Sequence, residues 1–146
     1  MEQRIDIQHA QPEAWKAMYN LAGMVSRSGL SAIQKHLISV RTSQVNSCAY
    51  CINMHTEEAL KSGETQQRLF LLSAWRETDI FSDEEKALLA MTEEITLIHQ
   101  SGLTDATYSL ASRYFSEEQL SATIMSIVMM NAWNRIAIST RIPVGH

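Results

Sequence analysis

Two cysteines and a histidine form the segment of this sequence best suited to chemistry. Cys48 and Cys51 make a C-x-x-C motif, and His55 follows four residues after Cys51. We expect both thiols in the first turn of a helix capped by Asn46 or Ser47, where free backbone amides and the helix dipole favour the thiolate. Four positions amount to about 40° around a helix, so the imidazole and the Cys51 sulfur point to one side. His55 is therefore a candidate base, or a cationic partner for the thiolate.

A disulfide between Cys48 and Cys51 would add little to the stability of the fold. Closing so short a loop is worth only about 2 kcal/mol of chain entropy. Reversible redox chemistry explains the spacing better, because one sulfur can attack, the other can resolve, and an external reductant can restore both thiols.

Two other interpretations of these residues stay open. The cysteines could be inert core residues. Zinc could use Cys48, Cys51 and His55 as three ligands. The fourth ligand would then be His36 or His99. Against zinc, the sequence has no second C-x-x-C and no H-x-x-x-H from which a second loop could supply ligands.

His36 is the further candidate, on the helix expected before the cysteines. It lies beside Val40 and Ser43 at the edge of an apolar face, so its imidazole should point towards the interior. A core histidine that is hydrogen-bonded to a carbonyl is the simpler interpretation. A functional role requires that this helix pack against the cysteine helix.

The elements that must position these residues are helices in a single domain, residues 1–146. The chain is 45% hydrophobic, with five Gly and two Pro, and both prolines, Pro12 and Pro143, lie near the ends. Apolar residues recur at helical spacing, as in Leu88 and Met91. Length and pattern together predict an all-α domain with one core.

Helix starts are marked by Ser followed three residues later by Glu or Gln, at Ser31, Ser82 and Ser116. We predict helices over 12–27, 31–45, 48–62, 64–76, 83–100, 104–114 and 117–139. The last helix has almost no polar face, so it should be buried on most sides, at the centre of the bundle or against a second subunit. An oligomer is expected.

Composition and charge exclude several classes of partner. Twelve Lys and Arg stand against sixteen Asp and Glu, for a net charge of -4, and no basic run could follow a row of phosphates. The sequence shows neither a secretory signal nor the roughly 20 apolar residues of a membrane span. We therefore expect a cytoplasmic protein that binds neither nucleic acid nor membrane.

The segment from His36 to His55, HLISVRTSQVNSCAYCINMH, resembles the signature of the alkylhydroperoxidase AhpD-like branch of the carboxymuconolactone decarboxylase family. The likeness continues through residues 75–78, Phe81 and residues 131–135. It covers most of the chain from about residue 30 to residue 138.

This resemblance implies an all-α AhpD-like bundle assembled into dimers, trimers or hexamers. It also implies a thiol-dependent peroxidase of peroxiredoxin type, which reduces hydrogen peroxide or organic hydroperoxides without a bound cofactor or metal and is reset by an external dithiol or protein reductant. In the family pattern Cys51 attacks the peroxide, Cys48 condenses with the resulting sulfenic acid, and His55 joins the proton relay.

The sequence departs from this pattern at His36, where the family usually has the glutamate that begins the relay. A histidine can pass a proton near neutral pH, but it cannot supply a negative charge to His55. Glu57, Glu58 or Glu94 are candidates to supply it. Carboxymuconolactone decarboxylase-like chemistry, which does not rely on a C-x-x-C, and a non-catalytic redox-sensing or binding module are the alternatives.

Overall fold

The structure is a computed structural model that describes residues 2–145, and all of its regular elements are helical. In chain order these are α1 (Ile7–Ala10), α2 (Pro12–Ser26), α3 (Ala32–Val45), α4 (Ala49–Lys61), α5 (Gln66–Leu71), the 3-10 segment η1 (Leu72–Glu77), α6 (Asp83–Thr96), α7 (Asp105–Ala111) and α8 (Glu117–Thr140). The predicted all-α class is confirmed.

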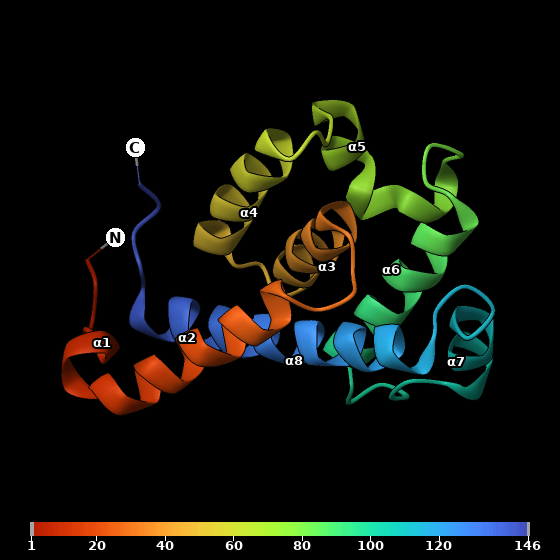
Figure 1. The fold of residues 1–146 in the computed structure, drawn as a ribbon. Helices are drawn as coiled ribbons and strands as arrows, with labels where there is room; N and C mark the ends of the chain where they lie inside the picture. Colours follow the sequence, from red (N-terminus) through yellow and green to blue (C-terminus); the bar gives the residue numbers. More distant parts are fainter. Residues whose placement is uncertain (1, 146) are drawn as a thin grey trace.

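Helix α3 lies at the centre of the bundle. It packs against α4, α6 and α8, while α8 runs along the base of the molecule with α2 beside it (Figure 1). Ile38 of α3 belongs to the core cluster shared with α6 and α8, and Leu37 and Val40 belong to the cluster under α5, η1 and α6. Because α3 is buried on both sides, the loop that leaves its C-terminus towards the cysteines starts from a fixed position.

Three helix starts follow the sequence signals closely. The hydroxyls of Ser31, Ser82 and Ser116 each accept a hydrogen bond from the backbone amide three residues later, and the Gln or Glu side chain there bonds back to the serine amide. Each reciprocal cap contributes about 1 kcal/mol to its helix. The predicted starts of α3, α6 and α8 are confirmed.

Other boundaries differ from the prediction. Helix α1 is one turn long, too short to show a periodicity, and was not predicted. The predicted helix 64–76 is divided into α5 and η1, with Ala74 in a non-helical conformation. Helix α6 ends at Thr96, and Ile98, which extends its apolar stripe in the sequence, lies exposed in the following turn.

Helix α8 is buried on one face only. Ile127, Met130 and Asn134 are buried, whereas Met125 and Val128 are exposed. The expectation that this helix is buried on most sides is wrong for the single chain, because α2, α3, α4 and α6 cover one side of it and leave the other open. None of the helices within residues 2–145 combines the length and apolarity that crossing a membrane requires.

Candidate active site

Cys48 and Cys51 are joined by a disulfide at the start of α4, with their Cα atoms 5.4 Å apart. The predicted cap, Asn46 or Ser47, is wrong by one or two residues, because Cys48 itself is the N-cap of α4. Ser47 has a left-handed φ of 57°, which turns the chain sharply. The Cys48 amide then donates to the Ser43 carbonyl at 2.9 Å. Cys51 lies in the first turn of α4, where backbone amides are free to stabilise a thiolate.

The disulfide is buried between α4 and α8. Cys48 is 1% exposed and Cys51 is 2% exposed, and both pack with Met130 and Ala137 of α8. Trp133 covers this cluster from the same helix. Burial of this kind limits which molecules reach the sulfurs to those that can enter an adjoining cavity.

A small amide network holds the loop before Cys48 against α8. The Asn46 side chain donates to Asn131 Oδ1 at 3.0 Å and to Asn134 Oδ1 at 2.9 Å. Asn134 in turn donates to Ser43 Oγ at 3.0 Å. Sequence analysis did not identify this network, although a pair of Asn residues on the apolar last helix was a signal for buried hydrogen bonds.

A cavity of about 350 Å³ adjoins the Cys51 side of the disulfide and is lined by residues of α2, α4 and α8. Cys51 and His55 both line it, so the structure brings this predicted pair to one space. Trp15, Tyr19 and Trp133 form its aromatic wall, with Trp133 packed edge-on against both other rings. The cavity therefore suits an apolar organic group beside the sulfur.

Glu58 is the carboxylate that pairs with His55. The distance from His55 Nδ1 to Glu58 Oε2 is 2.8 Å, and Glu58 also lines the Cys51 cavity. Glu57 lies on the outer side of α4, and Glu94 accepts hydrogen bonds from Thr104 beside α7. Of the three carboxylates considered from the sequence, Glu58 is the one placed to stabilise a protonated His55.

His36 lies half-buried where α3 packs against the far end of α4. Its Nε2 is 2.9 Å from Ser62 Oγ, and that hydroxyl donates to the Glu58 carbonyl at 3.0 Å. Burial lowers the pKa of His36, and the neighbouring His55 lowers it further. The negative charge of Glu58 partly offsets this lowering. The packing required for a functional role is therefore present, but His36 is coupled to His55 through Glu58 and α4, and lies outside the cavity beside Cys51.

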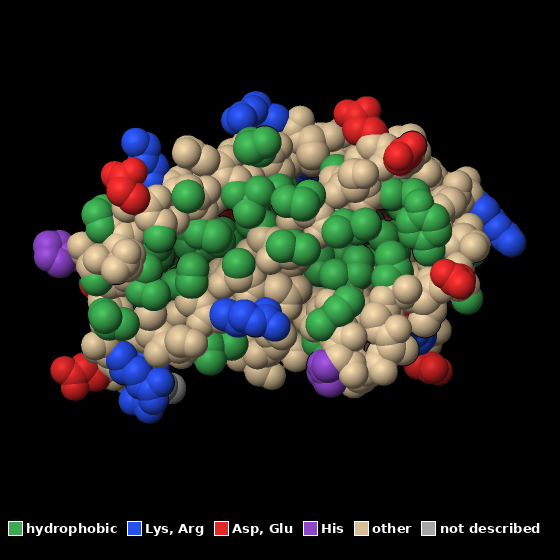
Figure 2. Space-filling model, turned by 90° about the horizontal axis from the view of Figure 1, so that it is seen from below, with side chains coloured by type: hydrophobic (Ala, Val, Ile, Leu, Met, Phe, Trp, Pro, Cys, Tyr) green, Lys and Arg blue, Asp and Glu red, His purple; other side chains and the backbone are tan. Residues whose placement is uncertain are grey.

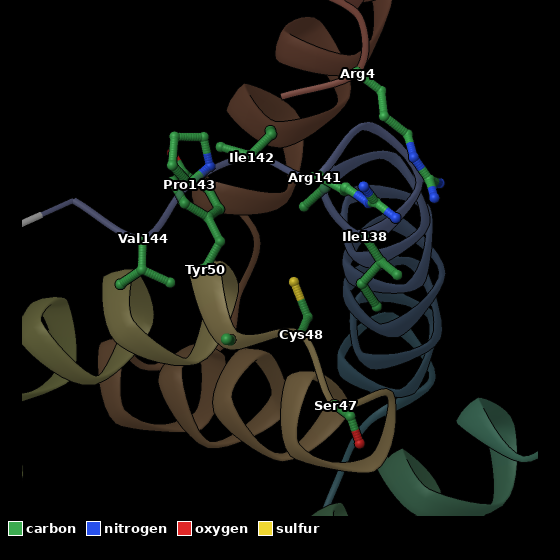
Figure 3. Close-up of a pocket in the computed structure, with 11 residues that line it drawn as sticks. Arg4, Ser47, Cys48, Tyr50, Ile138, Arg141, Ile142, Pro143 and Val144 are labelled. Carbon is green, nitrogen blue, oxygen red and sulfur yellow. The ribbon is translucent and has the colours of Figure 1, made fainter. Parts of the chain in front are cut away.

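A second, larger cavity of about 730 Å³ adjoins the Cys48 side of the disulfide (Figure 3). Its lining includes Arg4 and Arg141 near the two ends of the chain, together with Tyr50. Tyr50, one of the two residues between the cysteines, lines both cavities, as do Ala137 and Ile142.

Among the described residues, no three His, Cys, Asp or Glu side chains are grouped so that they could hold a metal ion. The candidate fourth ligands lie apart, since His36 bonds to Ser62 and His99 is exposed in the turn after α6. The two sulfurs are bonded to each other, and Cys48 lines one cavity while Cys51 lines the other.

Comparison with known proteins identifies the family of this chain. The model of the carboxymuconolactone decarboxylase family matches residues 12–94, more than half of the chain. An uncharacterised Bacillus subtilis protein, YdfG, is 40% identical over 139 residues that cover 95% of both chains.

Solved structures show the same fold. Atu0492 from Agrobacterium tumefaciens, a protein of unknown function provisionally described as an antioxidant defence protein AhpD, superposes with a TM-score of 0.97 at 35% identity, over 99% of each chain. The debrominase Bmp8, solved with 2,3,4-tribromopyrrole, has a TM-score of 0.84 at 16% identity, over 94% of this chain and 74% of its own, and shares the fold. On the family match, the relatives and the C-x-x-C, this chain belongs to the carboxymuconolactone decarboxylase family, in its AhpD-like branch.

Proposed function

We propose that the protein is a thiol peroxidase that reduces hydroperoxides with Cys51 and Cys48. The observation that carries this proposal is the buried redox pair at a helix start, with Cys51 and His55 lining one cavity. Both the free amides of the first turn and a neighbouring imidazole favour the thiolate that must attack. Cycling of this kind needs a compartment that keeps thiols reduced, which is the cytoplasm.

The reaction balances over two steps. The Cys51 thiolate attacks the terminal peroxide oxygen, the O–O bond breaks, and the leaving alkoxide takes a proton to become an alcohol, while Cys51 becomes a sulfenic acid. The Cys48 thiol then attacks the Cys51 sulfur, and water leaves as the disulfide forms. Two electrons from the dithiol have reduced the peroxide, and an external dithiol must return them.

His55 is the proposed proton carrier and Glu58 its positioning residue. Because Glu58 Oε2 lies 2.8 Å from Nδ1, the other ring nitrogen is available for exchange with Cys51 and the leaving oxygen. Glu58 thus supplies the negative charge that His36 cannot. His36 stands outside this pair, and its contact with α4 is the hydrogen bond between its Nε2 and Ser62 Oγ.

The aromatic cavity favours organic hydroperoxides over hydrogen peroxide. Its 350 Å³ exceeds what hydrogen peroxide needs, and its wall of Trp15, Tyr19 and Trp133 offers apolar contact to an alkyl or aryl group. Cumene hydroperoxide should therefore react with a lower KM than hydrogen peroxide.

The test is a single-turnover titration of reduced protein with one equivalent of cumene hydroperoxide. We expect loss of two thiols, a mass decrease of two hydrogens and one equivalent of the alcohol. Cys51→Ser should abolish this reaction, whereas Cys48→Ser should leave a sulfenic acid that dimedone traps on Cys51. Unchanged thiols would contradict the proposal and favour decarboxylase-like chemistry. Oxidation without turnover in excess dithiol would indicate a redox-sensing module.

We also propose that the chain forms a homo-oligomer through α2 and α8. Figure 2 shows apolar side chains gathered across the face that these helices form, and Met24, Met125 and Val128 are exposed there. Such a patch commonly marks a subunit contact. Light scattering should find an assembly in the parent protein and a smaller species in the variant Met125→Glu, Val128→Glu. Leu110→Glu on α7 is the control that should leave the assembly intact.

A further inference from the structure

The two sulfurs of the disulfide face two different spaces. The cavity of about 350 Å³ is lined by Cys51 and not by Cys48, and the cavity of about 730 Å³ is lined by Cys48 and not by Cys51. In Figure 3 the Cys48 sulfur points into the space between Tyr50, Ile142 and Ile138. One molecule can therefore approach Cys48 without entering the aromatic cavity beside Cys51.

The Cys48 cavity differs from its neighbour in charge. Two arginines, Arg4 and Arg141, line it, and no Asp or Glu does. Within residues 2–145 neither arginine forms an ion pair with a carboxylate. The Cys51 cavity, by contrast, contains Glu58 and no Lys or Arg.

The backbone fixes both arginines beside this cavity. Arg141 ends α8 in a left-handed conformation with φ 58°, so the chain turns back over the cysteines through Ile142. The Arg4 amide donates to the Thr140 carbonyl at 2.8 Å, and Arg4 Nη1 donates to the Ser139 carbonyl at 3.3 Å. The segment before α1 is thereby held against the end of α8, and two positive charges from opposite ends of the sequence meet at one opening.

We infer that the Cys48 cavity admits the reductant and selects a small dithiol that carries a carboxylate. This inference rests on the proposed function, because it names the reductant of that redox pair. The carboxylate would pair with Arg4 and Arg141, which places a thiolate of the same molecule near Cys48. A volume of about 730 Å³ is ample for a molecule of this size.

The exchange balances as follows. A thiolate of the reductant attacks Cys48 Sγ, the Cys48–Cys51 bond breaks, and the electron pair leaves on Cys51 Sγ. Cys51 is the better leaving group because it lies in the first turn of α4. The second thiol of the reductant loses its proton to solvent and attacks the mixed disulfide. The oxidised reductant departs, and the Cys48 thiolate takes up a proton. Peroxide and reductant then use opposite sides of one disulfide and do not compete for space.

The experiment compares dihydrolipoate with dihydrolipoamide. Both have the same dithiol, but dihydrolipoate carries a carboxylate where dihydrolipoamide carries a neutral amide. Reduction of the oxidised protein is followed without peroxide, by Trp fluorescence and by thiol counting. We expect dihydrolipoate to react about three- to fivefold faster at low ionic strength, the size of one exposed ion pair. The advantage should shrink towards unity in 1 M salt. Equal rates at low salt would overturn the inference.

Charge variants assign the preference to this cavity. The double variant Arg4→Gln, Arg141→Gln should bring the ratio of the two rates close to one. Arg113→Gln, which removes an equal charge beyond the opposite end of α8, should keep the ratio of the parent. A double variant that keeps the full preference would place the anion site elsewhere and overturn the inference.

The point of attack is tested separately with the monothiol 3-mercaptopropionate. Fragmentation mass spectrometry of the trapped mixed disulfide should locate the adduct on Cys48, and an adduct on Cys51 would overturn the proposed entry side. These readouts need no peroxide. If the anionic preference is found but hydroperoxide is not consumed, the proposed function fails and the reductant site stands. If neither dithiol reduces the disulfide, the reductant inference fails, while the single-turnover titration with cumene hydroperoxide still decides the proposed function.

Discussion

Two carboxylates of this molecule, Glu93 and Glu58, are held in very different ways. Glu93 on α6 is 12% exposed and accepts hydrogen bonds from Arg41 Nε and Trp75 Nε1, both at 2.8 Å, and from Arg76. Glu58 on α4 is 47% exposed and has one partner, His55. The first carboxylate is surrounded by fixed donors that tie α3, η1 and α6 together. The second retains the freedom that proton exchange requires.

The difference extends to titration. Burial opposes ionisation of Glu93, but the hydrogen bonds from Arg76 and Trp75 and the charge of Arg41 outweigh it and lower the pKa of this carboxyl below its ordinary 4.5. Near Glu58 the perturbed group is His36, whose pKa burial lowers from 6.5. One region thus keeps a charge that serves the fold, and the other contains His36, whose charged form burial disfavours.

The largest effect should follow Glu93→Gln. Loss of the negative charge leaves Arg41, 14% exposed, without its partner, so the free energy of unfolding should fall by about 3 kcal/mol. Urea denaturation measures this. Glu117→Gln in the exposed first turn of α8 is the control and should change stability by less than about 0.5 kcal/mol. A small effect at Glu93 would mean that the cluster does not anchor the fold.

Glu58→Gln should affect catalysis and leave the stability of the fold nearly unchanged, in contrast to Glu93→Gln. The value of kcat with cumene hydroperoxide should fall about tenfold, because His55 loses the anion that positions it, while KM and the urea midpoint change little. Glu57→Gln, the same change one residue away on the outer side of α4, should leave kcat intact. Glu58→Asp should recover part of the loss. Equal effects at Glu57 and Glu58 would remove Glu58 from the proposed relay.

A smaller effect concerns the pH dependence of stability. The folded pKa of His36 is lower than its unfolded value of 6.5, so as pH falls below 6.5 the unfolded chain binds a proton first and the free energy of unfolding decreases. His36→Gln should flatten this decrease between pH 6.5 and the folded pKa. The stability from Glu93 is instead present above pH 4.5 and lost as pH falls through its lowered pKa. Urea midpoints measured from pH 3 to 8 separate the effect of His36 from that of Glu93. If His36→Gln leaves the slope of stability against pH unchanged below pH 6.5, the prediction for His36 is contradicted.

Local signals explain what the sequence predicted well. A capping box needs two side chains within four residues, so Ser31, Ser82 and Ser116 could be recognised as helix starts. Glu58 was one of three carboxylates considered to supply the negative charge that His36 lacks, and it lies three residues after His55 on the same helix.

Long-range contacts explain what the sequence did not predict. The aromatic wall joins Trp15 and Tyr19 of α2 to Trp133 of α8, more than a hundred residues later, and neither helix alone indicates a cavity. Arg4 and Arg141 line the same cavity because the backbone at Arg4 is hydrogen-bonded to the end of α8 at Thr140. The cap at Cys48 was missed because serine rarely adopts the positive φ that Ser47 has.

Ser47→Gly should have the smallest effect and tests how the cysteine loop is held. Serine in the left-handed region costs about 1 kcal/mol, and glycine recovers this but gains freedom in the unfolded chain, so a net stabilisation of about 0.5 kcal/mol is expected. Asn46 keeps its bonds to Asn131 and Asn134, so the rate of disulfide reduction should stay within about twofold of the parent. Ser47→Ala, which keeps the backbone cost, should be neutral by urea denaturation. Faster thiol exchange in Ser47→Gly alone would show that the backbone at Ser47, more than the Asn46 network, holds Cys48 in place.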